Sequence, residues 1–341
     1  MKKINILAVM AIAALGTSNA NAAIDEPIFV NADNFIRAES DLYFGGIVKN
    51  GGFGRLDHTR EMAPLDKQTV IRLNRDTVYS SGVYDLDAGP IRVVVPDTDG
   101  RFTSLQVISQ DHYTYGVFYG QTDQVIRKED VGTRYVALAF RLLADPQDPA
   151  DMSKVHALQD RIQVTQQGQG SFEIPEWDME SQTQTRATLN ALASDLPDTA
   201  HMFGTKEEVE PVRHLLGTAY GWGGNPDRDA MYLNFVEPKN DGQTVYRVTI
   251  GEVPVKSFWS ISLYNAEGFY EQNALNAYNL NSITAKKSND GTTTVQFGGC
   301  DGNIPNCLPT PAGWNWMVRL YQPEDQILNG SWSFPRAVEV Q

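Results

Sequence analysis

Cysteine is scarce in this sequence of 341 residues, and clusters of basic residues are missing. Two cysteines exclude a disulfide-dense scaffold and any multi-thiolate metal or iron–sulfur site. The chain has 42 Asp and Glu residues against 28 Lys and Arg residues, which gives a formal net charge of −14. Nucleic acids and anionic lipid surfaces bind clustered basic side chains, so the acidic balance argues against both as partners.

Common catalytic signatures are also absent. The sequence has no G-x-S-x-G, H-E-x-x-H, G-x-x-x-x-G-K-[ST] or S-x-x-K motif. Its five histidines are too far apart along the chain for a compact helical metal site. These absences weaken the hydrolase and nucleotide-binding interpretations without eliminating them. The sequence leaves any cofactor unknown, and a metal ion held by residues from distant strands stays open.

The long apolar run that is present lies at the N-terminus. Lys2 and Lys3 precede an apolar run over residues 4–15, and Ala20-Asn21-Ala22 has the A-x-A pattern of a signal peptidase site. A membrane anchor needs about 20 apolar residues, which is more than this run has. We therefore expect a signal peptide over residues 1–22, a mature protein in a bacterial periplasm and no membrane span. Cleavage removes two lysines and changes the formal charge to −16.

Both cysteines lie in one short loop. Cys300 and Cys307 flank a segment rich in Gly, Asn and Pro that can fold back on itself. Disulfides persist in an exported protein, so we expect one local disulfide. A redox pair or a metal-binding thiol pair is the alternative, but the C-x-x-C spacing and a nearby His are lacking.

The alternation of strand and helix signals predicts a mainly β fold. Strand-like runs occupy 70–86, 91–95, 102–109 and 135–141, and most of 31–141 has this character. Strand signals return at 244–250, 258–264, 292–297 and 315–321. We predict two β-sandwiches joined by central helices. The expected divisions are 1–22, 23–144, 145–230 and 231–341.

The central segment carries helix start signals. Asp151 is a candidate cap for one helix, and a second helix is expected over 185–196. Thr205 and Glu208 form a T-x-x-E capping box before a third helical pattern. Pro211 lies inside that pattern, so the third helix is either kinked there or starts later.

Two polar clusters are candidate sites. Asn74-Arg75-Asp76 interrupts an apparent strand shortly before Tyr79, and a regular strand would place Asn74 and Asp76 on one face. Asp111-His112-Tyr113 follows the end of another strand, where sites are often placed. An acid beside a histidine and a tyrosine can transfer protons or bind a polar ligand. The competing interpretation is a network of hydrogen bonds that holds corners of the fold.

Aromatic and amide side chains alternate in the C-terminal region. Trp259 and Tyr264 lie on one expected strand, and Asn265 and Gly268 open the end of that strand. Rings that stack beside amides that form hydrogen bonds suit a sugar-like or other small polar ligand. Packing inside a sandwich core explains most of these aromatics equally well. The candidate ligand-binding residues are Asn74, Asp76, Tyr79, Tyr113, Trp259 and Tyr264.

Several of these segments carry a resemblance to known families. Residues 74–80, 85–90 and 111–113 resemble the domain of unknown function 1254, and residues 258–264, 279–281 and 329–332 resemble the domain of unknown function 1214. The resemblance implies an N-terminal immunoglobulin-like β-sandwich, a helical segment and a C-terminal jelly-roll-like β-sandwich. It does not imply a settled activity. Some similar proteins carry a carboxylesterase label, but this sequence lacks the nucleophile elbow of that chemistry.

Two functions follow from these observations. The favoured one is binding of a small polar molecule in a pocket between the two sandwiches. The alternative is a hydrolase or lyase that uses His112 as acid or base, Asp111 to orient it and Arg75 to stabilise negative charge. The sequence leaves the ligand and the oligomeric state open.

Overall fold

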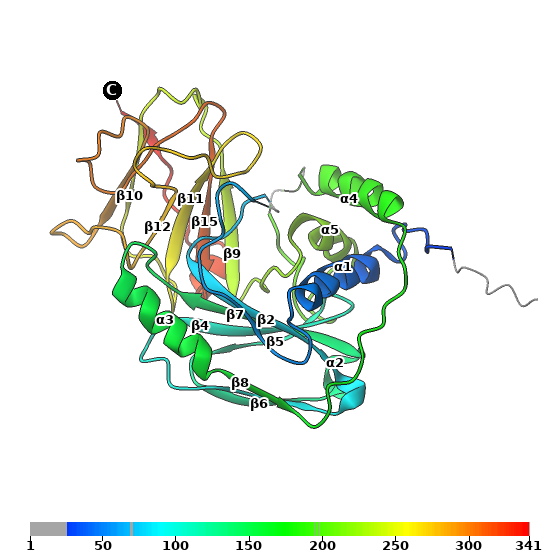
Figure 1. Ribbon diagram of the computed structural model, residues 1–341. Helices are drawn as coiled ribbons and strands as arrows, with labels where there is room; N and C mark the ends of the chain where they lie inside the picture. The colour runs from blue at the N-terminus through cyan, green and yellow to red at the C-terminus, as the bar shows by residue number, and fades with distance from the viewer. Residues whose placement is uncertain (1–25, 69–70, 195, 197, 341) are drawn as a thin grey trace, which may run out of the picture.

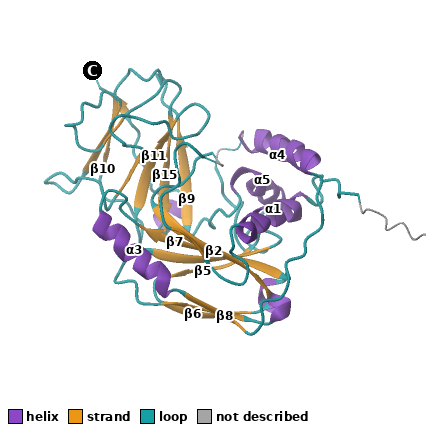
Figure 2. Cartoon of the chain, viewed as in Figure 1, coloured by secondary structure: helices purple, strands orange, loops and turns teal. Residues whose placement is uncertain are grey.

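The structure is a computed structural model, and it describes residues 26–68, 71–194, 196 and 198–340. The expected signal peptide lies outside these residues. The protein is mainly β, as predicted, with two β-sandwiches and additional helices (Figures 1 and 2). No helix in the described part of the chain is long and apolar enough to cross a bilayer.

The N-terminal sandwich encloses one apolar core between two sheets. Its strands are β1 (Asp57–Thr59), β2 (Thr77–Asp85), β3 (Ile91–Val95), β4 (Thr103–Ser109), β5 (Thr114–Tyr119), β6 (Thr122–Ile126), β7 (Tyr135–Leu143) and β8 (Gln163–Gln166). One sheet has the order β1-β2-β7-β4-β5 and the other β6-β3-β8, and all neighbours are antiparallel. The expected strand over 70–86 was too long, because residues 71–76 form turns and irregular chain.

Helix α3 (Pro149–Arg161) covers the N-terminal core. Met152, Val155 and Leu158 recur at helical spacing and are buried in that core. Asp148 caps the helix by accepting a 2.9 Å hydrogen bond from the backbone N–H of Ala150. The predicted cap was therefore wrong by three residues, because Asp151 lies inside the helix. The proline at the first helical position explains the earlier start.

The C-terminal sandwich consists of two four-stranded sheets. Its strands are β9 (Ala230–Phe235), β10 (Tyr246–Ile250), β11 (Trp259–Tyr264), β12 (Asn279–Asn281), β13 (Thr293–Phe297), β14 (Cys307–Leu308), β15 (Asn315–Tyr321) and β16 (Val338–Glu339). The two sheets have the orders β12-β11-β15-β9 and β14-β13-β10-β16. In β11, Trp259, Ile261 and Leu263 enter the core, whereas the alternate residues face the N-terminal domain.

A helical lobe packs against the outer face of the larger N-terminal sheet (Figure 1). It contains α1 (Phe35–Lys49), α4 (Met179–Ser194) and α5 (Pro211–Gly221). The start of α5 at Pro211 confirms the second of the two predicted options. Helix α1 lies in a region expected to be mostly strand, and this expectation was wrong. Buried acids between its apolar residues obscure the helical period: Glu39 is buried because Arg186 pairs with it at 2.6 Å.

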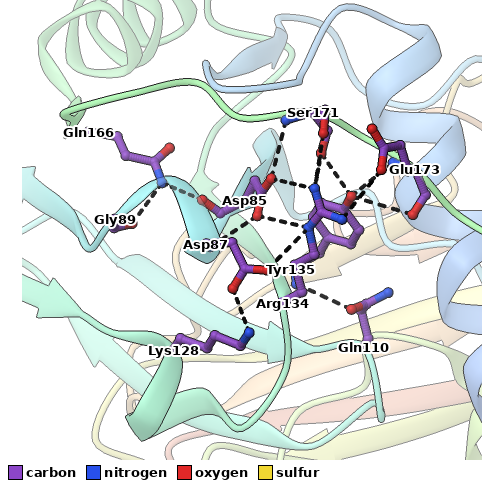
Figure 3. A network of polar contacts seen from close by, with 10 residues as sticks. All are labelled: Asp85, Asp87, Gly89, Gln110, Lys128, Arg134, Tyr135, Gln166, Ser171 and Glu173. Atoms are coloured by element: carbon purple, nitrogen blue, oxygen red, sulfur yellow. Dashed lines mark hydrogen bonds and ion pairs between the residues drawn. The ribbon is translucent and has the colours of Figure 1, made fainter.

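A polar network fixes the chain that crosses from β8 to the helical lobe (Figure 3). Arg134 donates to both carboxylate oxygens of Asp85, at 3.1 and 2.9 Å, and the backbone N–H of Ser171 donates to the same group at 3.2 Å. Burial alone would raise the pKa of Asp85, but these hydrogen bonds outweigh it and lower that pKa. Gly170 is needed here, since its φ is 70° and a Cβ would lie 2.4 Å from Asp85.

Three short helices and one disulfide complete the described fold. The helices are η1 (Leu86–Ala88), α2 (Lys128–Val131) and α6 (Asp325–Leu328). Cys300 and Cys307 form the predicted disulfide, with their Cα atoms 5.7 Å apart. The disulfide closes one loop of the C-terminal sandwich.

Candidate functional site

The first predicted cluster lies at the junction of the two sandwiches. The side-chain amide of Asn74 donates to the hydroxyls of Tyr79 and Tyr321, at 3.1 Å each. Its carbonyl oxygen accepts from the backbone N–H of Asp76 at 2.9 Å. Asn74 thus shapes its own turn and also connects the N-terminal domain to β15.

Asp76 is fully buried in this junction. One carboxylate oxygen accepts a 3.0 Å hydrogen bond from Asn279 of the C-terminal domain, and the other has no partner among the described residues. Burial raises the pKa of Asp76, and the positive charge of Arg319 opposes part of this rise. Arg319 is itself buried and donates to Ser262 and Tyr264, at 2.8 Å each.

Arg75 points away from Asp76. Its guanidinium lies over the rings of Tyr270 and Tyr278, at 5.9 and 5.6 Å from their centroids, and donates to the carbonyl of Ala63. Tyr264 donates to the carbonyl of Leu73 at 2.9 Å. The predicted residues Asn74, Arg75, Asp76, Tyr79 and Tyr264 therefore meet, but they hold two domains together.

The second predicted cluster is elsewhere, against helix α5. His112 is 2% exposed and lies 2.8 Å from Thr218 through Nδ1, while its Nε2 accepts from the backbone N–H of Gly223 at 2.8 Å. Thr218 donates its own proton to the carbonyl of His214, so Nδ1 of His112 is the donor to Thr218. Burial lowers the pKa of His112 well below its usual value, with His214 as a smaller cause. The ring is neutral and fully hydrogen-bonded.

His112 also stands in the middle of a column of stacked rings. The order is Tyr43, Trp222, His112, His214 and Tyr113, with centroid separations of 4.5, 5.4, 5.4 and 4.7 Å. This column joins α1, α5 and the loop after β4. Its geometry explains the burial of His112 as packing between the helical lobe and the sheet.

The remaining predicted residues do not assemble around His112. The carboxylate of Asp111 pairs with Arg37 at 2.5 Å, and it makes no contact with the ring of His112. Trp259 is 5% exposed and lies in the C-terminal core, on the opposite face of β11 from Tyr264.

A serine–histidine contact exists in the N-terminal sandwich. Oγ of Ser80 lies 2.7 Å from Nδ1 of His58 and also accepts from Gln159 at 3.0 Å. Ser80 has no exposed surface, so a substrate carbonyl has no access to it. This pair therefore joins β1, β2 and α3 instead of forming a nucleophile and its base.

An open cleft does lie between the two sandwiches. It has a volume of about 680 Å³ and is bounded by the 98–102 turn and α3 on one side and by residues 256–258 and Ile283 on the other. We call it the interdomain cleft. Its charged lining residues are Asp99, Arg101, Asp151, Lys154, Arg161 and Lys256.

The charge of the interdomain cleft is opposite to that of the chain. Arg101 pairs with Asp151 through both guanidinium nitrogens, and this hydrogen bonding is the main cause that lowers the pKa of Asp151. Asp99 is the other acid of the lining, against Lys154, Arg161 and Lys256. Four basic and two acidic side chains leave a charge of +2 in a protein of net charge −14.

None of the candidate catalytic or ligand-binding residues predicted from the sequence lines the interdomain cleft. Asp151, Lys154 and Arg161 follow one face of α3, so their spacing in an expected helix was an available signal. Lys256 comes from the other domain, and its approach to α3 depends on domain packing. Across the described residues, no group of three or more His, Cys, Asp or Glu side chains is placed to hold a metal ion.

Known proteins share this fold, but no curated protein matches the sequence. The VPA0106 protein from Vibrio parahaemolyticus is 18% identical, with a TM-score of 0.67 over 92% of this chain and 100% of that chain. A putative uncharacterized protein from Burkholderia cenocepacia is 12% identical, with a TM-score of 0.51 over 90% of this chain and 87% of that chain. At these identities the similarity shows the fold alone.

Two family models match in the order that the sequence motifs indicated. The model described as protein of unknown function (DUF1254) matches residues 53–128, within the N-terminal sandwich. The model described as protein of unknown function (DUF1214) matches residues 234–325, within the C-terminal sandwich. The chain therefore carries a DUF1254 domain followed by a DUF1214 domain, in the tandem arrangement predicted from its sequence.

Proposed function

We propose that this protein is exported to a bacterial periplasm and binds a small anionic molecule in the interdomain cleft. The observation that carries the proposal is the set of four basic side chains around a cavity between the domains of an acidic protein. A volume of about 680 Å³ falls within the usual range for small-molecule sites. The expected signal peptide supports export.

The basic side chains differ in their availability to a ligand. Arg101 is engaged with Asp151, and Arg161 donates to the carbonyl of Asp97 at 3.3 Å. Lys154 and Lys256 form no ion pair with any described residue, and they approach the cleft from opposite domains. An anion between these two ammonium groups would gain charge–charge attraction from both sides. It would also neutralise their mutual repulsion.

The alternative of a hydrolase or lyase based on His112 has less support. His112 already has partners for both ring nitrogens, and Arg75 contacts tyrosines of the C-terminal domain instead of the surroundings of His112. General acid–base catalysis needs a ring nitrogen within reach of a substrate proton. We therefore favour binding over catalysis.

The test measures thermal stability with added anions. Protein purified from a periplasm, where we expect Ala23 as the first residue, is titrated with acetate, phosphate and hexanoate at constant ionic strength. Saturation with a bound anion raises Tm by about 2–5 °C, because the ligand stabilises the native state. The double variant Lys154→Gln/Lys256→Gln should lose this rise.

The matched control is Lys286→Gln/Lys287→Gln, which removes the same charge from exposed positions outside the cleft. This control should keep the full rise in Tm. Absence of a rise with all three anions in the wild-type protein would contradict the proposal. An equal loss of the rise in both double variants would contradict it too, since it would show a general charge effect.

A further inference from the structure

We propose that the interdomain cleft selects an organic anion with an apolar body over an inorganic anion. This inference rests on the proposed function and adds the chemical class of the ligand. It comes from the apolar part of the lining, which the charge argument does not use. The apolar residues of that lining are Phe102, Leu143, Ala157, Leu158, Phe258 and Ile283.

The apolar lining residues, which we call the apolar floor of the cleft, are already assembled. Phe102 meets Phe258 edge to face at 5.0 Å, and Phe258 stacks on Tyr321 at 4.2 Å. This aromatic cluster joins the two domains, so the floor does not have to form when a ligand arrives. A preformed apolar surface beside a few charged groups is typical of sites for small organic molecules.

Ile283 places a further apolar surface at the edge of the cleft. The residue is 66% exposed, so most of its apolar surface is open to solvent beside the cleft. The turn that carries it is fixed, because the side chain of Asn281 accepts hydrogen bonds from the backbone N–H groups of Ile283 and Thr284, at 3.0 and 2.9 Å. Asn281 is 3% exposed. Ile283 is therefore held in water opposite α3, where a ligand with an apolar body would cover it.

The size of the cleft favours the same class of ligand. A volume of about 680 Å³ corresponds to roughly twenty water molecules at about 30 Å³ each. A phosphate ion between Lys154 and Lys256 would leave most of this space to solvent. An anion that extends from the two lysines toward Phe102 and Ile283 would use the charged rim and the apolar floor together.

Calorimetric titration with acetate, butyrate and hexanoate tests the inference at constant ionic strength. These probes share one carboxylate head and differ only in methylene groups. We expect the affinity to rise about two- to fourfold for each added methylene, because each is removed from water by the floor. Ile283→Ser should reduce this dependence on chain length while leaving the affinity for acetate within about twofold of wild type.

The control for Ile283→Ser is Val338→Ser, which changes a residue of similar exposure, 64%, outside the cleft lining. It should keep the wild-type dependence on chain length. Equal affinities for the three carboxylates would overturn this inference and leave the proposed function standing. If none of them binds and phosphate does not bind either, the proposed function itself fails. An unchanged dependence on chain length in Ile283→Ser would also contradict the inference, since it would place the apolar body elsewhere.

Discussion

The backbone of His112 adopts a left-handed conformation, with φ at 61°, and its ring is enclosed by Trp222, His214 and Phe203. A side chain other than glycine adopts this conformation at a cost, which its surroundings must offset. Here the offset comes from two hydrogen bonds and from the stacked column. His112 therefore ties the loop after β4 to the helical lobe.

Replacing His112 with Asn should lower stability in a pH-dependent way. Asn tolerates the left-handed backbone but loses the stacking, so we expect a loss of about 2–4 kcal/mol at pH 7.5. The folded pKa of His112 is lowered, so only the unfolded chain takes up this proton just below pH 6.5. The free energy of unfolding of the wild type therefore includes the full contribution of His112 above pH 6.5. It decreases by about 1.4 kcal/mol when the pH is lowered to 5.5. The difference in Tm between wild type and variant should therefore narrow at pH 5.5.

Calorimetry at pH 7.5 and 5.5 measures both effects. The control is His201→Asn, since His201 has a similar φ of 58° but is exposed. It should change stability little at either pH. An unchanged Tm in His112→Asn with loss of a measurable turnover would instead support the catalytic role suggested by the sequence.

For individual residues, the sequence indicated which polar side chains belong to a cluster, but it did not indicate which residues they contact. Asn74 and Asp76 form a hydrogen bond within one turn, and Tyr264 donates to the carbonyl of Leu73 beside that turn. Tyr321 and Asn279, which contact Asn74 and Asp76, lie 247 and 203 residues away along the chain. Whether a buried polar cluster binds a ligand or another domain depends on this tertiary packing, which no local pattern contains.

Among the larger elements, the crossing segment after β8 is positioned by a polar network that includes Asp85, Arg134 and Tyr135. Asp85 receives hydrogen bonds from Arg134, from Ser171 and from the backbone N–H of Asp87 (Figure 3). Gly170 passes so close to this carboxylate that any larger residue must displace it. The segment leads to α4, so its position also sets the position of the helical lobe.

Replacing Gly170 with Ala should lower the free energy of unfolding by about 2–3 kcal/mol. Two effects add up: the positive φ disfavours alanine, and the new Cβ displaces Asp85 from Arg134. Gly168→Ala is the matched control, because its Cβ would meet only ordinary contacts at 3.6 Å or more. Urea unfolding of both variants measures the difference. Equal stability of the two variants would refute the role given to the Asp85 network.

Helices and strands were predicted well where the spacing of apolar residues in the sequence matches the burial of those residues in the structure. Strand β15 was expected over 315–321 and is found over those residues: Trp316, Val318 and Leu320 enter the C-terminal core, whereas the alternate residues are buried on the other face of the strand. Helix α1 was missed, since its buried Glu39 and Asp41 look like surface residues in a sequence. Their burial depends on partners from α4 and from the loop after β4.

For the molecule as a whole, the junction between the sandwiches contains a buried polar layer beside the aromatic cluster of Phe102, Phe258 and Tyr321. Arg319 donates to the backbone carbonyl of Arg72 at 2.7 Å, while Asn279 donates to Asp76 at 3.0 Å. Such a layer contributes less than an apolar interface would, but removing one charge from it leaves the other buried and uncompensated. The relative position of the domains, and with it the shape of the interdomain cleft, depends on this layer.

A double-mutant cycle should detect coupling between Arg319 and Asp76. Arg319→Met should cost about 3–5 kcal/mol, because it leaves Asp76 without a compensating charge. Adding Asp76→Asn should recover part of that loss, at least about 1 kcal/mol, as measured by thermal and urea unfolding. The exposed pair Arg92 and Asp123 provides the control cycle, with an expected coupling below about 1 kcal/mol. A coupling no larger than that of the control pair would contradict the role of the layer.

The helical lobe has a consequence for how the chain folds. Helix α1 ends at Lys49, but its partners α4 and α5 begin at Met179 and Pro211. Phe35 and Ala38 on α1 pack against Leu189, Ala193 and Leu216, so during synthesis they stay uncovered until more than half of the chain has emerged. We therefore expect that the N-terminal sandwich does not fold independently: a fragment ending at residue 167 contains all its strands but neither α4 nor α5, and it should aggregate. The DUF1254 model matches residues 53–128, whereas the part of the chain that must fold together also includes α1, α4 and α5.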